Sequence, residues 1–153
     1  MSYIEQNLMN GENVLYQARL HWVIFLWPAI IFIIAIMYCI VGGEGAVFGG
    51  LLIFIGIITG VISIIKYRTS EFGITNKRVI VKVGFISRNS LEVLLNKVEG
   101  IQVNQDILGR IFDYGSITIS GTGGTKDPFH KIEAPFDFRK KAQEQIAAIQ
   151  DSK

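Results

Sequence analysis

The sequence has little of what most catalytic and metal sites require. Among its 153 residues there is one cysteine, Cys39, and there are two histidines, His21 and His130. A lone cysteine excludes an intramolecular disulfide and a cysteine-rich metal site, and the histidines lack partners at the spacing of metal ligands. The sequence also lacks the G-x-S-x-G and H-E-x-x-H motifs. We therefore expect no enzymatic activity, no cofactor and no bound metal.

One glycine-rich stretch, GTGGTK (121–126), resembles a phosphate-binding loop only in composition. A P-loop has Gly next to Lys, and a helix begins directly after it. Here Thr125 separates Gly124 from Lys126, and Pro128 leads into another expected strand. The stretch is therefore expected to be a turn between two late strands.

Charge is scarce and unevenly distributed. Charged residues make up 18% of the chain and apolar residues 50%, and the mean hydropathy of +0.38 is high for a soluble domain. Residues 66–153 hold 14 of the 15 basic and 10 of the 13 acidic residues. This mild excess of basic over acidic residues suits a surface beside anionic lipid. It is too weak and too interspersed with acidic residues to indicate nucleic-acid binding.

Two runs, residues 22–41 and 46–65, carry no charge at all. Twenty helical residues at about 1.5 Å each cover about 30 Å, the thickness of a bilayer core. A signal peptide is a poor interpretation of the first run, because about twenty mixed residues precede it and no small-residue cleavage site follows. Only GGEG (42–45) separates the runs, so we expect a transmembrane hairpin.

The flanking charges predict how the hairpin is oriented. Arg19 precedes the first run, Lys66 and Arg68 follow the second, and the loop offers only Glu44. The positive-inside rule then places both termini in the cytoplasm and the loop outside.

The second run also contains small residues at steps of three and four, which let helices approach closely. They include Gly49, Gly56, Gly60 and Ser63. Packing against the first run of the same chain is the favoured interpretation, and a homodimer face is the alternative. Neither run holds an ionisable residue that would mark a transport path.

From residue 70 the apolar period changes to two, which is typical of strands. Strands are expected at 77–83, 85–95, 98–103, 116–120 and 129–134, with Gly84 at the turn of the first hairpin. This spacing favours a strongly bent antiparallel sheet or barrel. The segment NVLYQARL (13–20) alternates as well, and we expect it to join this sheet.

Two segments after residue 100 have helical rather than alternating spacing. Residues 135–150 place Phe138 and Ala142 on one face, which predicts a C-terminal helix that closes the sheet. The segment QDILGRIFDYG (105–115) is interpreted as a short helix or as a hydrophobic loop that dips towards the bilayer. Packing of its apolar residues under the sheet is the favoured interpretation.

The stretch from GITNKRVIVKVG to GTGGT (73–125) resembles the membrane-flanked bacterial pleckstrin-homology-like (PH-like) family, a former domain of unknown function with two N-terminal transmembrane helices. The shared motifs are T-x-x-R, a hairpin glycine, K-x-E-x-I-x-V, Q-x-x-L-G-R and Y-G before a strand. They fall here on Thr75, Arg78, Gly84, Lys97, Gln105, Leu108, Gly109, Arg110 and Gly115. The resemblance implies a bent antiparallel sheet of about seven strands closed by a C-terminal helix, and no established enzymatic activity.

The family resemblance and the two uncharged runs together predict how the chain is divided into segments. A cytoplasmic segment (1–21) precedes transmembrane helices 22–41 and 46–65, which flank an extracytoplasmic loop (42–45), and a cytoplasmic PH-like domain follows (66–153). The expected location is the bacterial cytoplasmic (inner) membrane, with several passes.

Six basic residues are candidates for contact with anionic lipid headgroups, with a merely solvated hairpin as the alternative. They are Lys66, Arg68, Lys77, Arg78, Lys82 and Arg88. The favoured function is a non-enzymatic, membrane-anchored interaction module that binds a protein partner or forms a homo-oligomer. The alternative is a sensor of anionic headgroups or of membrane state through the basic hairpin.

Overall fold

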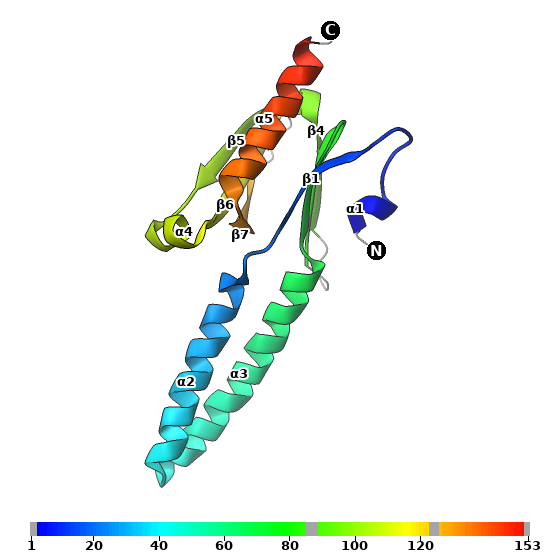
Figure 1. Cartoon of the computed structure of the whole chain (residues 1–153). Coiled ribbons are helices and arrows are strands. Elements are labelled where there is room, and N and C mark those ends of the chain that lie inside the picture. The colour runs from blue at the N-terminus through cyan, green and yellow to red at the C-terminus, as the bar shows by residue number, and fades with distance from the viewer. Residues whose placement is uncertain (1–2, 85–88, 123–125, 152–153) are drawn as a thin grey trace. The chain divides into compact units, whose positions relative to one another are not determined.

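The computed structural model of the chain describes residues 3–84, 89–122 and 126–151. It separates into two compact units. One unit, called here the sheet unit, combines Met1–His21 with Thr69–Lys153. The other, the helical unit, is Trp22–Arg68. The two apolar runs therefore interrupt the sheet unit between its first strand and the rest (Figure 1).

The helical unit contains a 3-10 turn η1 (Trp22–Phe25), helix α2 (Leu26–Val41) and helix α3 (Glu44–Thr69). The helical span Trp22–Val41, made of η1 and α2, and helix α3 are each long and apolar enough to cross a membrane. Most of their large apolar side chains are exposed, unlike those of a core helix in a soluble protein. Helix α3 also extends beyond the expected 46–65 and takes Glu44, Lys66 and Arg68 into its ends.

Helix α3 turns small residues towards α2. Its buried residues are Gly49, Gly56 and Ser63. A Cβ atom at Gly49 would lie 2.5 Å from Sγ of Cys39, and one at Gly56 would lie 3.3 Å from the ring of Phe32. A Cβ atom at Gly60 would meet nothing within 4 Å. The close approach within the chain thus uses the first two glycines and not Gly60.

Seven strands in the described residues form two antiparallel sheets. The first has the order β1 (Val14–Arg19), β2 (Glu71–Thr75), β3 (Arg78–Val83), β4 (Asn89–Leu94). The second has the order β5 (Val98–Asn104), β6 (Tyr114–Gly121), β7 (Lys126–Glu133). The expected number of about seven strands is confirmed, but within the described residues they form two sheets and no closed barrel, because a 3-10 turn η2 (Leu95–Lys97) separates β4 from β5. The two sheets meet at the bridge of Leu20 with Ile132.

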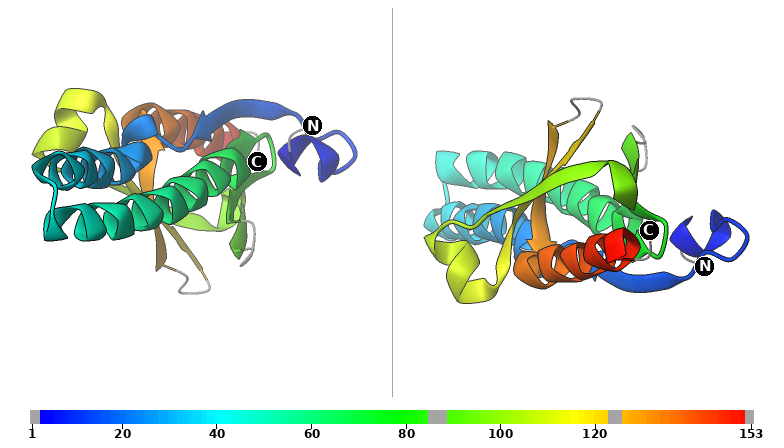
Figure 2. Two further views of the ribbon diagram at one scale, coloured as in Figure 1. Left: turned by 90° about the horizontal axis from the view of Figure 1, so that it is seen from below. Right: turned by 90° about the horizontal axis from the view of Figure 1, so that it is seen from above.

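Alternation of side chains places the core between the sheets. In β6, Ile117 and Ile119 are buried as predicted, and Phe72 of β2 packs edge-on against Phe129 of β7 at 6.1 Å. Helix α5 (Pro135–Asp151) buries Phe138 and lies against strands of both sheets (Figure 2). The predicted C-terminal helix is present and covers this core.

The segment before the first apolar helix belongs to the first sheet. A short helix α1 (Tyr3–Gln6) buries Ile4 beside Gly73, where a Cβ atom would lie 2.6 Å from Cδ1 of Ile4. Strand β1 then pairs with β2, Ala18 opposite Phe72. The strand expected at 13–20 therefore lies at the edge of the sheet.

Two expected turns fall partly outside the described residues. Strand β3 ends at Val83 and pairs there with Asn89, and the expected start of the next strand at residue 85 lies outside the described residues, because 85–88 are not described. Gly84, with φ of 92°, has the left-handed backbone that favours glycine. Ser120, the residue before GTGGTK, pairs with Lys126 at its end, so the stretch connects two antiparallel strands, and residues 123–125 are not described.

Candidate functional sites

The guanidinium of Arg78, at the start of β3, is buried under the N-terminal segment. Its Nε donates to Oε1 of Glu12 at 2.9 Å, and its Nη2 donates to Oε2 of Glu12 at 3.0 Å. Nη2 also donates to the Asn7 carbonyl at 2.6 Å, and Nη1 to Oε2 of Glu92 at 2.5 Å. Only 7% of the Arg78 side chain is exposed, and none of Glu12. This two-pronged geometry is the strong form of an arginine–carboxylate pair.

Thr75, at the end of β2, completes this group. Its hydroxyl donates to Oε1 of Glu12 at 2.7 Å and accepts the backbone N–H groups of Lys77 and Arg78. The T-x-x-R motif thus folds the turn between β2 and β3 with its threonine and ties that turn to the N-terminal segment with its arginine. We call Glu12, Thr75, Arg78 and Glu92 the charge cluster.

The charge cluster shifts two pKa values. Burial alone raises the pKa of Glu12, but hydrogen bonds from Arg78, the Met9 N–H and Thr75 outweigh it and hold that pKa below its ordinary 4.5. The hydrogen bond to Glu12 raises the pKa of Arg78, against the opposing effect of burial. Both groups are therefore charged at neutral pH, and each is the compensation for burying the other.

The six basic residues proposed for headgroup contact are not equivalent. Arg78 offers no exposed guanidinium, so the structure removes it from that set. Lys77 is exposed and its Nζ donates to the Asn10 carbonyl at 2.7 Å. The Nζ of Lys82 lies 3.9 Å from the ring centroid of Tyr3, in a cation–π contact.

The remaining three lie elsewhere. Lys66 and Arg68 are exposed in the last turn of α3, within the helical unit. Arg88 lies outside the described residues. The six positions therefore do not form one site within either unit.

The Q-x-x-L-G-R motif builds a six-residue helix, α4 (Ile107–Phe112), fixed against the start of β6. The carboxylate of Asp106 caps it by accepting the Gly109 N–H at 2.6 Å. A Cβ atom at Gly109 would lie 2.5 Å from the Tyr114 carbonyl oxygen. The Nε2 of Gln105 donates to that same carbonyl at 3.1 Å. Glutamine and glycine are thus the residues that seat this helix.

The apolar side chains of α4 point away from the sheets, which corrects the expectation that they pack underneath. Ile107 is 80% exposed, Ile111 69% and Leu108 53%. At about 100° per residue, Ile107 and Ile111 flank the direction opposite Gly109, the buried residue of α4. Since Gly109 must face β6, the isoleucines face outward. Arg110 is exposed beside them.

His21 and Tyr114 meet where α4 joins β6. The backbone N–H of His21 donates to the Lys131 carbonyl at 2.7 Å, and the two rings lie 5.4 Å apart. Burial, then the nearby Asp106 carboxylate, raises the pKa of Tyr114. His130 is exposed on β7. No group of three or more potential metal ligands occurs among the described residues.

Close packing also requires a glycine at Gly115, a third glycine of the family motifs. A Cβ atom there would lie 2.8 Å from the Asn104 carbonyl oxygen. Sequence reasoning missed Glu12 and Glu92, the acidic partners of Arg78. One available signal was the strand at 13–20: once it pairs with β2, Glu12 must lie close to Thr75 at the same end of the sheet.

Two antiparallel sheets, a C-terminal helix and two exposed apolar helices define a mainly-β domain attached to a helical hairpin. A family model for the bacterial PH domain matches residues 20–153. The match covers most of the chain, so the chain belongs to the bacterial PH domain family, as its motifs indicate. Comparison with curated proteins and with solved structures gave no match.

Proposed function

We propose that this chain is a non-enzymatic integral membrane protein of the bacterial cytoplasmic membrane. Its PH-like sheet unit lies in the cytoplasm and binds a protein partner or a second copy of the chain. The observation that carries the proposal is the family match, because residues 20–153 include both apolar helices and the sheet unit from β2 onward. The chain is thus one membrane-anchored interaction module and not two unrelated parts.

The ends of the apolar helices support the membrane assignment. Arg19 lies just before the first helix, and Lys66 and Arg68 occupy the last turn of the second. The connection between the helices carries Glu44 instead. Basic residues on this side alone favour a cytoplasmic sheet unit.

The sheet order supports a protein partner. Strands β4 and β5 are outer strands of their sheets, whereas the other two outer strands, β1 and β7, approach each other at the bridge of Leu20 with Ile132. An outer strand offers backbone N–H and C=O groups to a strand from another chain. Such pairing needs no catalytic residues and suits an interaction module.

An anionic-headgroup sensor is the second candidate. Lys82 pairs across the sheet with Glu71, which lies two residues beyond the end of α3. Lys82 is thus paired with a residue that follows α3 closely in sequence, and α3 carries the exposed cations Lys66 and Arg68 in its last turn. Each such cation near an anionic surface contributes about 1 kcal/mol.

A photo-crosslinking amino acid at Ser90 of β4 tests the first candidate in living cells. We expect a discrete protein adduct, identified by mass spectrometry, because Ser90 is exposed on an outer strand. The same probe at Gln143, exposed on α5, is the control and should yield none. Lipid adducts alone, from probes at Ser90 and Lys82, would favour the sensor.

Topology is tested separately with fusions at the C-terminus. We expect an alkaline phosphatase fusion to be inactive and a green fluorescent protein fusion to fluoresce. An active phosphatase fusion would place the sheet unit outside the cytoplasm and overturn the orientation.

A further inference from the structure

The exposed apolar residues of the sheet unit are concentrated on α4. Four of the six residues of this helix are large, apolar and exposed: Ile107, Leu108, Ile111 and Phe112. Elsewhere in the described part of the sheet unit, such residues occur singly, as at Leu15 and Leu94. Single exposed apolar residues are ordinary, whereas a cluster marks an interaction surface.

This surface is a helix that hydrogen bonds hold at both ends. The Asp106 carboxylate caps the first turn, and Gln105 bridges to the Tyr114 carbonyl. The helix ends at Phe112, and the residue that follows it, Asp113, has a left-handed φ of 55° and a carbonyl that accepts the Ala134 N–H at 3.0 Å. Because both ends are fixed and Gly109 faces inward, Ile107 and Ile111 are held outward by the fold itself.

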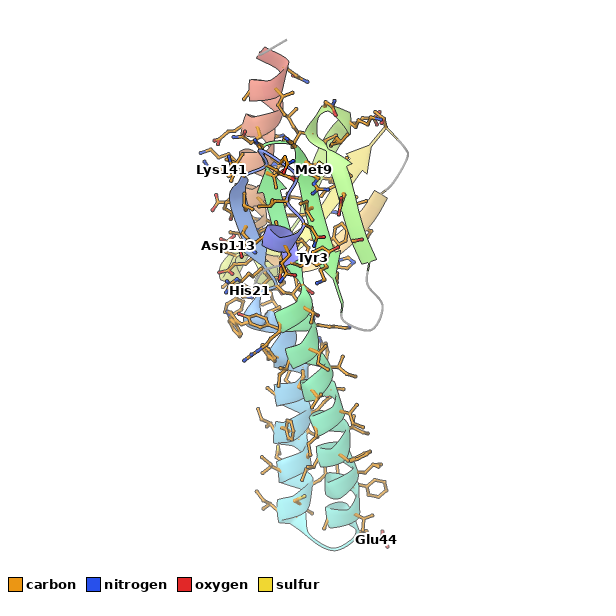
Figure 3. All side chains as sticks on the ribbon, turned by 90° about the vertical axis from the view of Figure 1, so that its right-hand side faces the viewer. Tyr3, Met9, His21, Glu44, Asp113 and Lys141 are labelled. Carbon is orange, nitrogen blue, oxygen red and sulfur yellow. The ribbon has the colours of Figure 1, made fainter. Side chains whose placement is uncertain are left out.

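Contacts within the sheet unit place α4 close to His21, the residue that precedes the first apolar run. The ring of His21 lies 5.4 Å from that of Tyr114, and Tyr114 is only two residues, at most about 7 Å of chain, beyond the end of α4. Trp22, the next residue after His21, begins the uncharged run. Figure 3 shows Asp113, the residue that follows α4, near His21. Helix α4 therefore lies beside the residue at which the chain leaves the sheet unit.

We propose that α4 is embedded in the headgroup–acyl boundary of the membrane that α2 and α3 cross, with Ile107, Leu108 and Ile111 in the apolar layer. This inference rests on the proposed membrane spanning of those helices. Exposed Arg110 lies beside the isoleucines, where a cation meets anionic headgroups. The Asp106 carboxylate, the one acidic group at the start of α4, is turned inward and accepts a hydrogen bond from the Gly109 N–H. A bilayer is the expected occupant, because the chain passes from His21, beside α4, directly into the first apolar run.

Spin-label depth measurements on the full chain test this proposal. Single cysteines are placed at Ile107 and Ile111 in a Cys39→Ser background, labelled, and reconstituted in vesicles of phosphatidylethanolamine with a minority of phosphatidylglycerol. Accessibility to oxygen, which concentrates in lipid, is compared with accessibility to a water-soluble nickel chelate. We expect an oxygen-to-nickel ratio several-fold above that of a label at Leu94. Leu94 is exposed, and it lies at the end of β3 and β4 opposite to the end at which the chain enters the sheet from α3.

A label at Ile33, exposed on α2, separates the two levels of the proposal. If Ile33 reports lipid while Ile107 and Ile111 match Leu94, α4 lies in water, and the inference fails while membrane spanning stands. If Ile33 also reports water, membrane spanning itself is wrong. Labels on α4 shielded from both reagents would mean that a second copy covers the helix, which would also overturn the proposal.

Discussion

The charge cluster and α4 reverse, in opposite senses, the usual distribution of residues in a soluble domain. The charge cluster buries an arginine and a glutamate under the N-terminal segment, while α4 holds isoleucines in the open. Charged groups are rarely buried unless they are paired, and clustered apolar groups are rarely exposed unless something covers them. The buried charge cluster and the exposed apolar residues of α4 therefore each require a partner that compensates them.

The difference between them is where that partner comes from. For Arg78 the partners are within the chain, because Glu12, Glu92 and the Asn7 carbonyl accept its hydrogen bonds. For α4 the sheet unit contacts only the side of the helix that carries Gly109. The charge cluster is thus an internal connection between the N-terminal segment and the sheet, whereas α4 is a surface built for an external medium.

The largest effect is expected from Arg78→Met, which leaves the Glu12 carboxylate buried without its partner. The loss in the free energy of unfolding of the sheet unit should be about 3–5 kcal/mol. Hydrogen exchange of β3 backbone amides in micelles of the full chain measures it. Lys141→Met is the control, because it breaks the exposed 3.0 Å pair with Glu144, and that loss should be below about 0.5 kcal/mol.

The double variant Glu12→Met with Arg78→Met tests the same pair from the other side. Removing both charges leaves no unpaired ion in the interior, so much of the stability lost in Arg78→Met should return. A double variant less stable than Arg78→Met would show that the two residues act separately, and the charge cluster would not be a connection.

A smaller effect is expected from Gly109→Ala at α4. The new Cβ would lie 2.5 Å from the Tyr114 carbonyl oxygen and 2.6 Å from the Asp106 carboxylate, so the helix must shift. A loss of about 1–3 kcal/mol is expected for such overpacking, with faster hydrogen exchange in α4 and at the start of β6. Gly100→Ala is the matched control, since its Cβ would meet nothing within 4 Å. Equal exchange rates in the two variants would contradict the seating of α4 on β6.

Local patterns predicted the elements well and the partners poorly. The apolar runs, the alternation at Ile117 and Ile119 and the C-terminal helix follow from periodicity along a few residues. Burial of Arg78 does not, because Glu12 lies 66 residues away in sequence, beyond both apolar runs. The pattern in α4 was ambiguous in another way: helical spacing of Ile107 and Ile111 is the same whether the helix faces a core or a membrane. Only the close contact at Gly109 decides which side faces inward.

The charge cluster also predicts how stability depends on pH. The pKa of Glu12 is lowered in the folded state, so its contribution is present above the unfolded value and is lost as pH falls through the folded one. The stability difference between the wild type and Glu12→Gln should therefore be largest at neutral pH and shrink below about pH 4.5. Unfolding across this range by amide exchange measures it. Glu144→Gln, in the exposed pair on α5, should differ from the wild type by less than about 0.5 kcal/mol throughout, and a constant difference for Glu12→Gln would count against its buried charge.

The smallest effect is expected where apolar residues face outward. Replacing Ile107 and Ile111 by serine should change the free energy of unfolding of the sheet unit by less than about 0.5 kcal/mol, because these side chains contact little of it. Ile117→Ser on β6 is the matched control, and since Ile117 is buried, a loss of about 2–5 kcal/mol is expected. Amide exchange in β6 compares the variants. If replacing Ile107 and Ile111 destabilised the sheet unit as much as Ile117→Ser, α4 would pack on the protein. The charge cluster, whose partners lie within the chain, would then no longer differ from α4, whose partner is expected outside it.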